Sequence, residues 1–269
     1  MKKILSFAAA VLCTVAMSAQ DVRVLSFNLG SDEGGHNWEN RSVDIAAMLQ
    51  KQAPDVIGLQ ECSASRRKSL EKQLGGYSAV ELSKKGASDN LIFYCKETAD
   101  VLSSGSFSLG DKPDRPISRF SCGEQDCNAV WAVFRLKNGR EVLFVNTTFD
   151  AKSKEARVLQ AELVLEQAGK LSGGRPVVVT GTLNCKPSPW NDKSRAPGFI
   201  FKSAGLLDAR QMAIGTDSKP SFTAWGTDSR TTDYIFYTVN GLSAIQFRTI
   251  DGKGPLSDHN PIRANLKFK

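Results

Sequence analysis

The apolar residues of this chain fall into short runs that predict buried strands alternating with helices. The runs VRVLSFN (22–28) and PDVIGLQE (54–61) are rich in aliphatic residues and each ends in a polar residue, which predicts two strands. Between them, segment 41–52 places Ile45 and Leu49 at helical spacing. The chain is therefore expected to open as strand, helix, strand.

The remainder of the first half continues this pattern. Segment 63–74 predicts a second helix with Ser63 as its N-cap, because a serine hydroxyl can accept a hydrogen bond from the first turn. The runs YSAVEL (77–82) and NLIFYC (90–95) predict strands, and residues 105–128 form a turn-rich stretch.

The second half repeats the pattern of strands and helices. Strands are expected at AVWAVFRL (129–136) and EVLFVNTTFD (141–150), joined by KNGR, whose Asn-Gly pair favours a hairpin. A helix over 154–171 and three further strands follow, at PVVVTGTLN (176–184), TDYIFY (232–237) and SAIQFRTI (243–250). Because no linker separates the two halves, we expect residues 21–269 to form a single α/β domain with two sheets face to face and helices outside.

The first twenty residues differ from the rest and predict a secretory signal peptide. Lys2 and Lys3 precede an apolar run from Ile4 to Ala16, and the small-residue stretch MSAQ follows. A membrane anchor is the alternative, but the run is shorter than the roughly 20 residues that span a bilayer. We therefore expect a protein without a transmembrane segment after cleavage, starting near Gln20 or Asp21 and secreted or periplasmic.

Charge and cysteine content add modest constraints. The formal net charge is +7, and loss of the two leader lysines would reduce it to about +5, a weak preference for anionic partners. The spacing of Cys122 and Cys127 predicts a disulfide that closes a small loop, whereas the pairing of Cys62, Cys95 and Cys185 stays open. With only His36 and His259 in the chain, a zinc site is not expected.

Several predicted strands end in side chains suited to a hard cation. Asn28, Glu61 and Asn184 each follow an apolar run, and Asp258 and His259 lie together in SDHNPI. Magnesium binds carboxylate and amide oxygens and usually keeps several waters. Each residue also has a structural alternative, since an asparagine can stabilise a turn, an aspartate can cap a helix and a histidine can be buried and hydrogen-bonded.

Taken together and in order, these segments resemble the endonuclease/exonuclease/phosphatase superfamily, which has the deoxyribonuclease-I-like fold. The resemblance spans nearly the whole chain after the leader. It rests on seven short motifs, each containing a candidate site residue or a family signature. They are SFN with Asn28, PDVIGLQE with Glu61, VNTTFD ending at Asp150, TGTLN with Asn184, TDYIF with Asp233, SDHNPI with Asp258 and His259, and the Trp-x-x-Arg of NWENR (37–41).

The resemblance implies a four-layer α-β-β-α sandwich, with two mixed sheets between outer helices, that hydrolyses phosphoesters with Mg²⁺ or Mn²⁺, weakly bound. Glu61, Asn28 and Asp258 would hold the metal. His259, oriented by Asp233, would act on the phosphoryl group, because a carboxylate fixes the tautomer of a histidine.

Three further residues are candidates for substrate binding, Asn184, Asn146 and Arg66. By the same resemblance Asn184 would contact the phosphate and is also a catalytic candidate. Arg66 belongs to a basic cluster at 66–68, for which a solvent-exposed helix face is the alternative interpretation. Basic residues are not interleaved with aromatics, so nucleic acid is possible but not indicated. The expected partner is a phosphorylated small molecule or a phosphodiester.

The chain departs from the family pattern at one cluster of positions. Thr182 stands where the family has the aspartate of Gly-Asp-x-Asn, and Thr148 stands where it has the histidine of Asn-Thr-His. The glutamate partner of that histidine aligns with Ser88, with Asp89 beside it, and an arginine expected near Cys127 is absent. A threonine hydroxyl is too weak a base to replace a carboxylate at neutral pH.

Three hypotheses follow from these departures. The first is a protein that retains a metal and phosphate pocket but is impaired in catalysis. The second is an active phosphodiesterase or phosphatase in which His259 or Asp150 acts as the base. The third is a non-catalytic domain that binds a partner. Metal binding separates the third from the others, and turnover separates the first from the second.

Overall fold

The computed structural model of the protein describes residues 21–269 except 82–88, 190–195, 252–253 and 255. The predicted leader, 1–20, and Ser88 lie outside the described residues. Within these residues, no helix combines the length and the apolar character needed to cross a bilayer.

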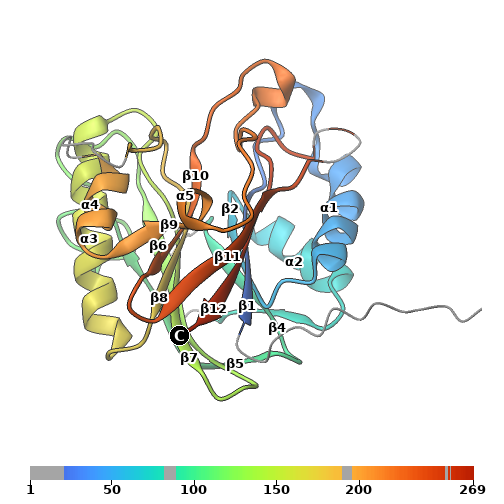
Figure 1. The fold of residues 1–269 in the computed structure, drawn as a ribbon. Coiled ribbons are helices and arrows are strands. Elements are labelled where there is room, and N and C mark those ends of the chain that lie inside the picture. Colours follow the sequence, from blue (N-terminus) through green and yellow to red (C-terminus); the bar gives the residue numbers. More distant parts are fainter. Residues whose placement is uncertain (1–20, 82–88, 190–195, 252–253, 255) are drawn as a thin grey trace, which may run out of the picture.

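Two sheets of six strands each form the centre of the fold (Figure 1). The first has the order β11-β12-β1-β2-β4-β3, from Leu242–Thr249, Ile262–Phe268, Asp21–Asn28, Val56–Gln60, Leu91–Cys95 and Tyr77–Ala79. The second has the order β5-β6-β7-β8-β10-β9, from Ala99–Ser108, Asn128–Leu136, Glu141–Thr148, Val177–Thr182, Asp233–Thr238 and Leu206–Asp208. In each sheet a parallel pair, β1–β2 or β7–β8, lies among antiparallel neighbours.

Helices cover the outer face of each sheet, so the predicted four-layer sandwich is confirmed (Figure 1). On one side lie α1 (Trp38–Gln52) and α2 (Ala64–Gln73), and on the other α3 (Lys154–Ser172) and α4 (Pro197–Ser203). The Ser63 hydroxyl accepts a hydrogen bond from the Arg66 amide and caps α2 as predicted. Three short elements complete the described helices: α5 (Ala209–Met212), η1 (Glu33–Gly35) and η2 (Ala224–Gly226).

Three clusters of buried apolar side chains fill the spaces between the four layers. They explain why the valine-rich runs are apolar throughout. In β8, Val178 packs between the two sheets, whereas Val177 and Val179 pack on the side of α3 and α4. In β1, Val24 faces the other sheet and Leu25 faces the layer of α1 and α2. Strands buried on both faces have no polar face, which is why their sequences do not alternate.

The predicted hairpin is present, but the stretch 105–128 is only partly irregular. Asn138 and Gly139 form the turn between β6 and β7, where Gly139 has φ +80° and the Asn138 side chain accepts from the Arg140 amide. By contrast, β5 continues to Ser108. This edge strand contains several serines and exposed residues, and its register shifts after Val101. Its sequence therefore lacks the regular alternation of apolar and polar residues that predicts a strand.

The predicted disulfide is not formed, because Cys122 and Cys127 are both free thiols. Cys127 is buried in the cluster under α3, and its thiol is hydrogen-bonded to Gln160. Burial raises the pKa of this thiol to about 12, so it stays protonated. The five described cysteines, Cys62, Cys95, Cys122, Cys127 and Cys185, are all free.

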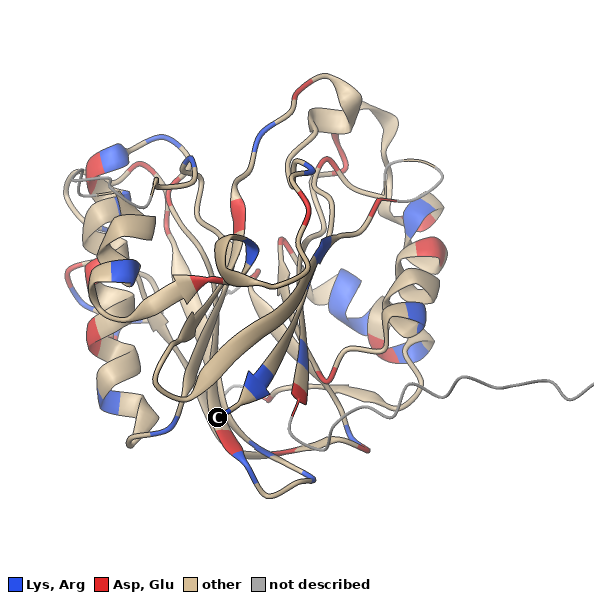
Figure 2. Cartoon of the chain, in the orientation of Figure 1, with Lys and Arg blue, Asp and Glu red and all other residues tan. Residues whose placement is uncertain are grey.

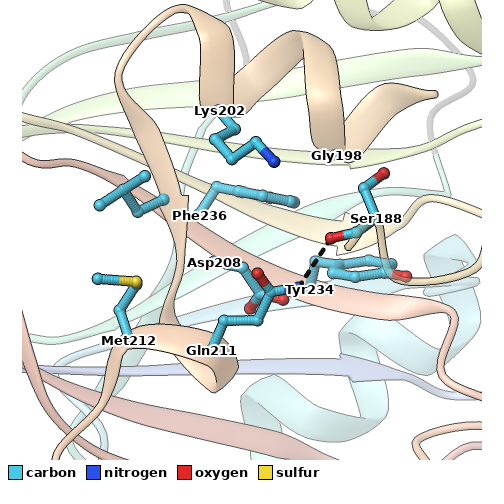
Figure 3. A pocket seen from close by; sticks show the side chains of 9 residues that line it. Ser188, Gly198, Lys202, Asp208, Gln211, Met212, Tyr234 and Phe236 are labelled. Atoms are coloured by element: carbon cyan, nitrogen blue, oxygen red, sulfur yellow. Dashed lines mark hydrogen bonds between the residues drawn. The ribbon is translucent and has the colours of Figure 1, made fainter. Parts of the chain in front are cut away.

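A buried carboxylate lies at the β9 edge of the second sheet. Asp208 is 6% exposed, and its Oδ1 accepts from the Arg210 amide at the start of α5. Its Oδ2 and the Ser188 hydroxyl have no hydrogen-bond partner among the described residues. Figure 3 shows both residues at a small pocket of about 10 Å³, beside the Gln211 side chain that donates to the Ser188 carbonyl. Burial raises the pKa of Asp208 to about 6.

Asp208→Asn is therefore expected to stabilise the protein above pH 6. In the native protein the stability contributed by protonated Asp208 is present below its unfolded pKa of 3.8 and is lost as the pH rises through about 6. An asparagine at position 208 can still accept the hydrogen bond from the Arg210 amide, but it carries no charge to desolvate. Urea unfolding at pH 7.5 should show a gain of about 1–3 kcal/mol that disappears at pH 4. The same gain from the exposed Asp114→Asn, or none from Asp208→Asn, would contradict the assignment.

Candidate functional site

The carboxyl ends of the two parallel strand pairs lie at the same edge of the sandwich and bring five site residues into one hydrogen-bonded row. The Asn28 amide donates to Glu61 Oε1 and to the Thr182 hydroxyl, both at 3.1 Å. Thr182 donates to Asp233 Oδ1 at 2.7 Å, and Asp233 Oδ2 contacts His259 Nδ1 at 2.8 Å. We call Glu61, Asn28, Thr182, Asp233 and His259 the polar row.

Backbone conformation places two side chains directly after their strands. Glu61, after β2, has φ +54°, and Asn184, after β8, has φ +50°. Left-handed φ values are uncommon in residues other than glycine and often mark functional sites. Gly181 is required because a Cβ there would collide with the Thr147 carbonyl of β7. The glycine of TGTLN therefore allows β7 and β8 to approach closely at the site.

The predicted Asp233–His259 pair is formed and buried. Burial raises the pKa of Asp233, but His259 and hydrogen bonds from Thr182 and Ser221 outweigh it and hold that pKa below its usual range. Burial likewise lowers the pKa of His259, but Asp233 and the Asp258 and Glu61 carboxylates outweigh it and raise that pKa. The pair is therefore stabilised in its charged form, with Nδ1–H donating to Asp233.

Glu61 and Asp258 provide carboxylates on one side of the row. Desolvation raises the pKa of Glu61, the Asn28 amide partly offsets this, and Asp258 raises it further. Asp258 Oδ1 accepts from Ser257, and it approaches Gly30 so closely that a Cβ there would collide with it. Two carboxylates suit a hard cation that keeps several waters. The Asn28 oxygen accepts from the Gly30 amide, so it has one further lone pair to offer such a cation. Within the described part of the chain, no three His, Cys, Asp or Glu side chains lie close enough together to form a metal-binding group.

Arg66, predicted to bind substrate, is instead bonded to the protein. Its guanidinium donates to the carbonyls of Gly30 and Glu61 and to Asp32, and it stacks over Trp38. These bonds hold the turn at Glu61 in its left-handed conformation. We therefore assign Arg66 to positioning Glu61. Its neighbour Arg67 pairs with Glu71 and Glu81 on the surface.

The prediction that Asn146 binds substrate is wrong, because this residue is completely buried between the sheets. Its amide donates to the carbonyls of Leu59 and Leu91, and its oxygen accepts from Gln60 and Thr180. Asn146 is 0% exposed. It joins the two sheets directly beneath the polar row, a structural role.

Thr148 is hydrogen-bonded to Asn90, a partner that the sequence comparison did not identify. The Thr148 hydroxyl donates to Asn90 Oδ1 at 2.9 Å, and the Asn90 amide donates to the Asn128 carbonyl and side-chain oxygen. The uncharged side chains of Thr148, Asn90 and Asn128 are therefore hydrogen-bonded to one another where the family pattern has a histidine and its carboxylate partner. Ser88 lies outside the described residues, and Asn90, the first residue before β4, is the residue that contacts Thr148.

Asp150, the alternative base, is not available for that role. Its Oδ2 accepts from the amides of Glu124 and Gln125, and its Oδ1 accepts from those of Lys152 and Ser153. Burial raises the pKa of Asp150, but these four hydrogen bonds outweigh it and lower the pKa. Asp150 therefore fixes the loop before α3 and does not accept a proton from water.

An open cavity of about 440 Å³ extends from Glu61 toward two loops. Its lining includes Thr148, residues 89–90 before β4, residues 125–127 before β6 and the first residue of β6, Asn128. Asn184 lies outside this lining and donates from its amide to the Phe149 carbonyl. Glu61 thus belongs both to the polar row and to the cavity, which gives a metal-bound ligand room to extend.

The fold agrees with the family comparison. The model of the Endonuclease/Exonuclease/phosphatase family matches residues 25–259. The chain therefore belongs to the endonuclease/exonuclease/phosphatase family.

Solved structures and one curated protein extend the comparison. An endonuclease/exonuclease/phosphatase from Bacteroides vulgatus is 27% identical, with 93% of this chain and 99% of that chain covered and a TM-score of 0.83. A mannosyl-6-phosphatase from Bacteroides thetaiotaomicron is 25% identical, with 92% and 100% covered and a TM-score of 0.81. Protein angel of Drosophila melanogaster is 26% identical over 164 residues, which cover 56% of this chain and 45% of that protein.

Proposed function

We propose that this protein binds a divalent cation and a phosphorylated ligand in the cleft at Glu61 and hydrolyses the phosphoester only slowly. One observation carries the proposal: the Thr182 hydroxyl lies inside the polar row, between Asn28 and Asp233, where the family pattern has a carboxylate. The metal end of the site is intact, whereas the group that would orient the attacking water is neutral.

The hydrogen bonds of Thr182 explain why it does not act as a base. Its proton is directed at Asp233, and its oxygen accepts from Asn28. Deprotonating an alcohol beside the Asp233 carboxylate would place two negative charges next to each other. Thr148 and Asn90, across the cavity, are neutral as well. General base catalysis contributes about 10²–10⁴ in rate, so its loss predicts a slow reaction.

The remaining residues of the row have clear roles toward a phosphate. Glu61, Asn28 and Asp258 would hold Mg²⁺ or Mn²⁺, which when bound neutralises phosphate charge and polarises water. Asp233 holds the His259 ring with Nδ1 toward it, so Nε2 is the atom that can donate to a phosphoryl oxygen. These interactions stabilise a bound phosphate whether or not it is cleaved.

The comparisons support a phosphoester as the ligand. The structure from B. thetaiotaomicron is described as a mannosyl-6-phosphatase, and it covers nearly all of this chain. The charged, apolar and small-residue order of the first twenty residues supports export from the cytoplasm as part of the same proposal.

A phosphoester panel tests this function. Purified protein starting at Asp21 is assayed with phosphomonoesters and phosphodiesters in Mg²⁺ or Mn²⁺. We expect metal-dependent binding of at least one ester, with turnover about 10²–10⁴ below the enzyme median of about 10 s⁻¹. Rapid metal-dependent hydrolysis that Glu61→Gln abolishes would refute impaired catalysis. Absence of binding to every ester and to inorganic phosphate would refute the phosphate site.

A further inference from the structure

We propose that the ligand of this site is the monophosphate ester of an uncharged polyhydroxylated alcohol, such as a sugar, and not a polyanion. The inference rests on the proposed phosphate binding and concerns the part of the ligand beyond its phosphate. It is carried by the chemistry of the 440 Å³ cavity that begins at Glu61.

The cavity lining is almost entirely polar. Beyond Glu61 it presents the hydroxyls of Ser31 and Thr148 and the amides of Asn90, Gln125 and Asn128. Among the described lining residues there is no aromatic ring and no large aliphatic side chain. Proteins bind unpaired bases largely by stacking them on aromatic rings, and they bind acyl chains on apolar surface. A base or an acyl chain therefore has no complementary surface in this part of the cleft.

The charge of the described lining also disfavours a second phosphate. Glu61, Asp89 and Asp126 contribute three carboxylates, and Arg66 is the one cationic side chain that the described lining contains. The Arg66 guanidinium is bonded to two carbonyls and Asp32. A metal ion at Glu61 can neutralise one phosphate, but a second phosphate would face Asp89 and Asp126.

The outer helices α1 and α3 carry no continuous run of basic residues. Nucleic-acid binding depends on Lys and Arg that neutralise successive phosphates. Figure 2 shows Lys and Arg interspersed with Asp and Glu along the outer helices α1 and α3. Arg119, which is not part of the cavity lining, lies 3.7 Å from the lining residue Asp126, so the positive charge of Arg119 is partly compensated.

Hydroxyl groups match the same lining. A carboxylate accepts hydrogen bonds and the NH2 group of a glutamine donates them, so Asp89, Asp126 and Gln125 can bind several hydroxyls of one ligand. Gln125 is held in place because its Oε1 accepts from the Ala151 amide. The structure thus pairs one phosphate-binding end with a hydroxyl-binding end.

Matched ligands test the inference on the native protein. Calorimetry in Mn²⁺ compares inorganic phosphate, glucose 6-phosphate, glucose 1,6-bisphosphate and adenosine 5′-monophosphate. We expect glucose 6-phosphate to bind at least about 10-fold more tightly than each of the others, since only it satisfies both ends. Bisphosphate or nucleotide binding as tight as that of glucose 6-phosphate would overturn the inference.

A charge-reversal variant provides an independent test. Asp126→Lys should raise the affinity for the bisphosphate relative to the monophosphate by about 10-fold, because it replaces a repulsive charge with an attractive one. Glu97→Lys, an exposed residue in the turn after β4, is the matched control and should change neither affinity. No change with Asp126→Lys would contradict the placement of the second phosphate. If all phosphates bind equally, the proposed function stands and this inference fails; if none binds, both fail.

Discussion

Replacing Thr182 by Asp and Thr148 by His together is expected to raise phosphoester turnover by about 10²-fold or more, and by more than either change alone. Thr182→Asp restores a carboxylate between Asn28 and Asp233, at the end of β8. Because the new charge lies beside Asp233, its benefit should depend on a bound cation. Thr148→His alone should help less, since its neighbour Asn90 is neutral.

The controls for this experiment separate charge from shape. Thr182→Asn has nearly the shape of the aspartate without its charge and should give no gain. Glu61→Gln in the double variant should abolish the gain, which excludes a contaminating hydrolase. A double variant that folds and binds metal but stays inactive would show that Thr182 and Thr148 are not the limiting positions. Adding Asn90→Glu would then test the missing carboxylate partner.

Glu61→Gln is expected to reduce Mn²⁺ affinity by at least about 10²-fold, because a site with few protein ligands depends on its carboxylates. The substitution keeps the size of the side chain, and its amide can still contact Asn28. Calorimetry of the native protein and the variant measures the change. Glu97→Gln, at an exposed turn, is the matched control and should bind like the native protein. Equal binding by Glu61→Gln would place the metal elsewhere.

Much of the fold was predictable because its strands are buried on both faces. Runs such as VIGLQ and PVVVT have no polar face, and each is followed by a residue with positive φ, Glu61 and Gly181 respectively. The edge strand β5 was partly missed because its serines and its register shift obscure the alternation. Local sequence patterns therefore predict which residues are buried better than they predict how an edge strand pairs.

At the site, the residues joined in the polar row could be predicted, but the function of their neighbours could not. Asn146, Asp150 and Arg66 have the side chains of a binding site, yet the structure uses each one to hold backbone or the other sheet. The role of Asn90 could not be predicted from the sequence, because its hydrogen bond with Thr148 joins residues that are 58 positions apart in the chain. Side-chain chemistry can be read locally, whereas the choice of partner depends on the packed sandwich.

The fate of a bound phosphoester under single-turnover conditions tests the central claim most directly. Protein in excess over glucose 6-phosphate, with saturating Mn²⁺, is quenched at intervals, and the ester and free phosphate are quantified by ³¹P nuclear magnetic resonance. The absence of a carboxylate at Thr182 predicts that the ester is bound yet survives with a mean lifetime of at least about 10 s, a cleavage rate below about 0.1 s⁻¹. Complete cleavage within about 1 s, lost in Glu61→Gln, would show that the polar row hydrolyses phosphoesters efficiently with a threonine at its centre and would contradict the account.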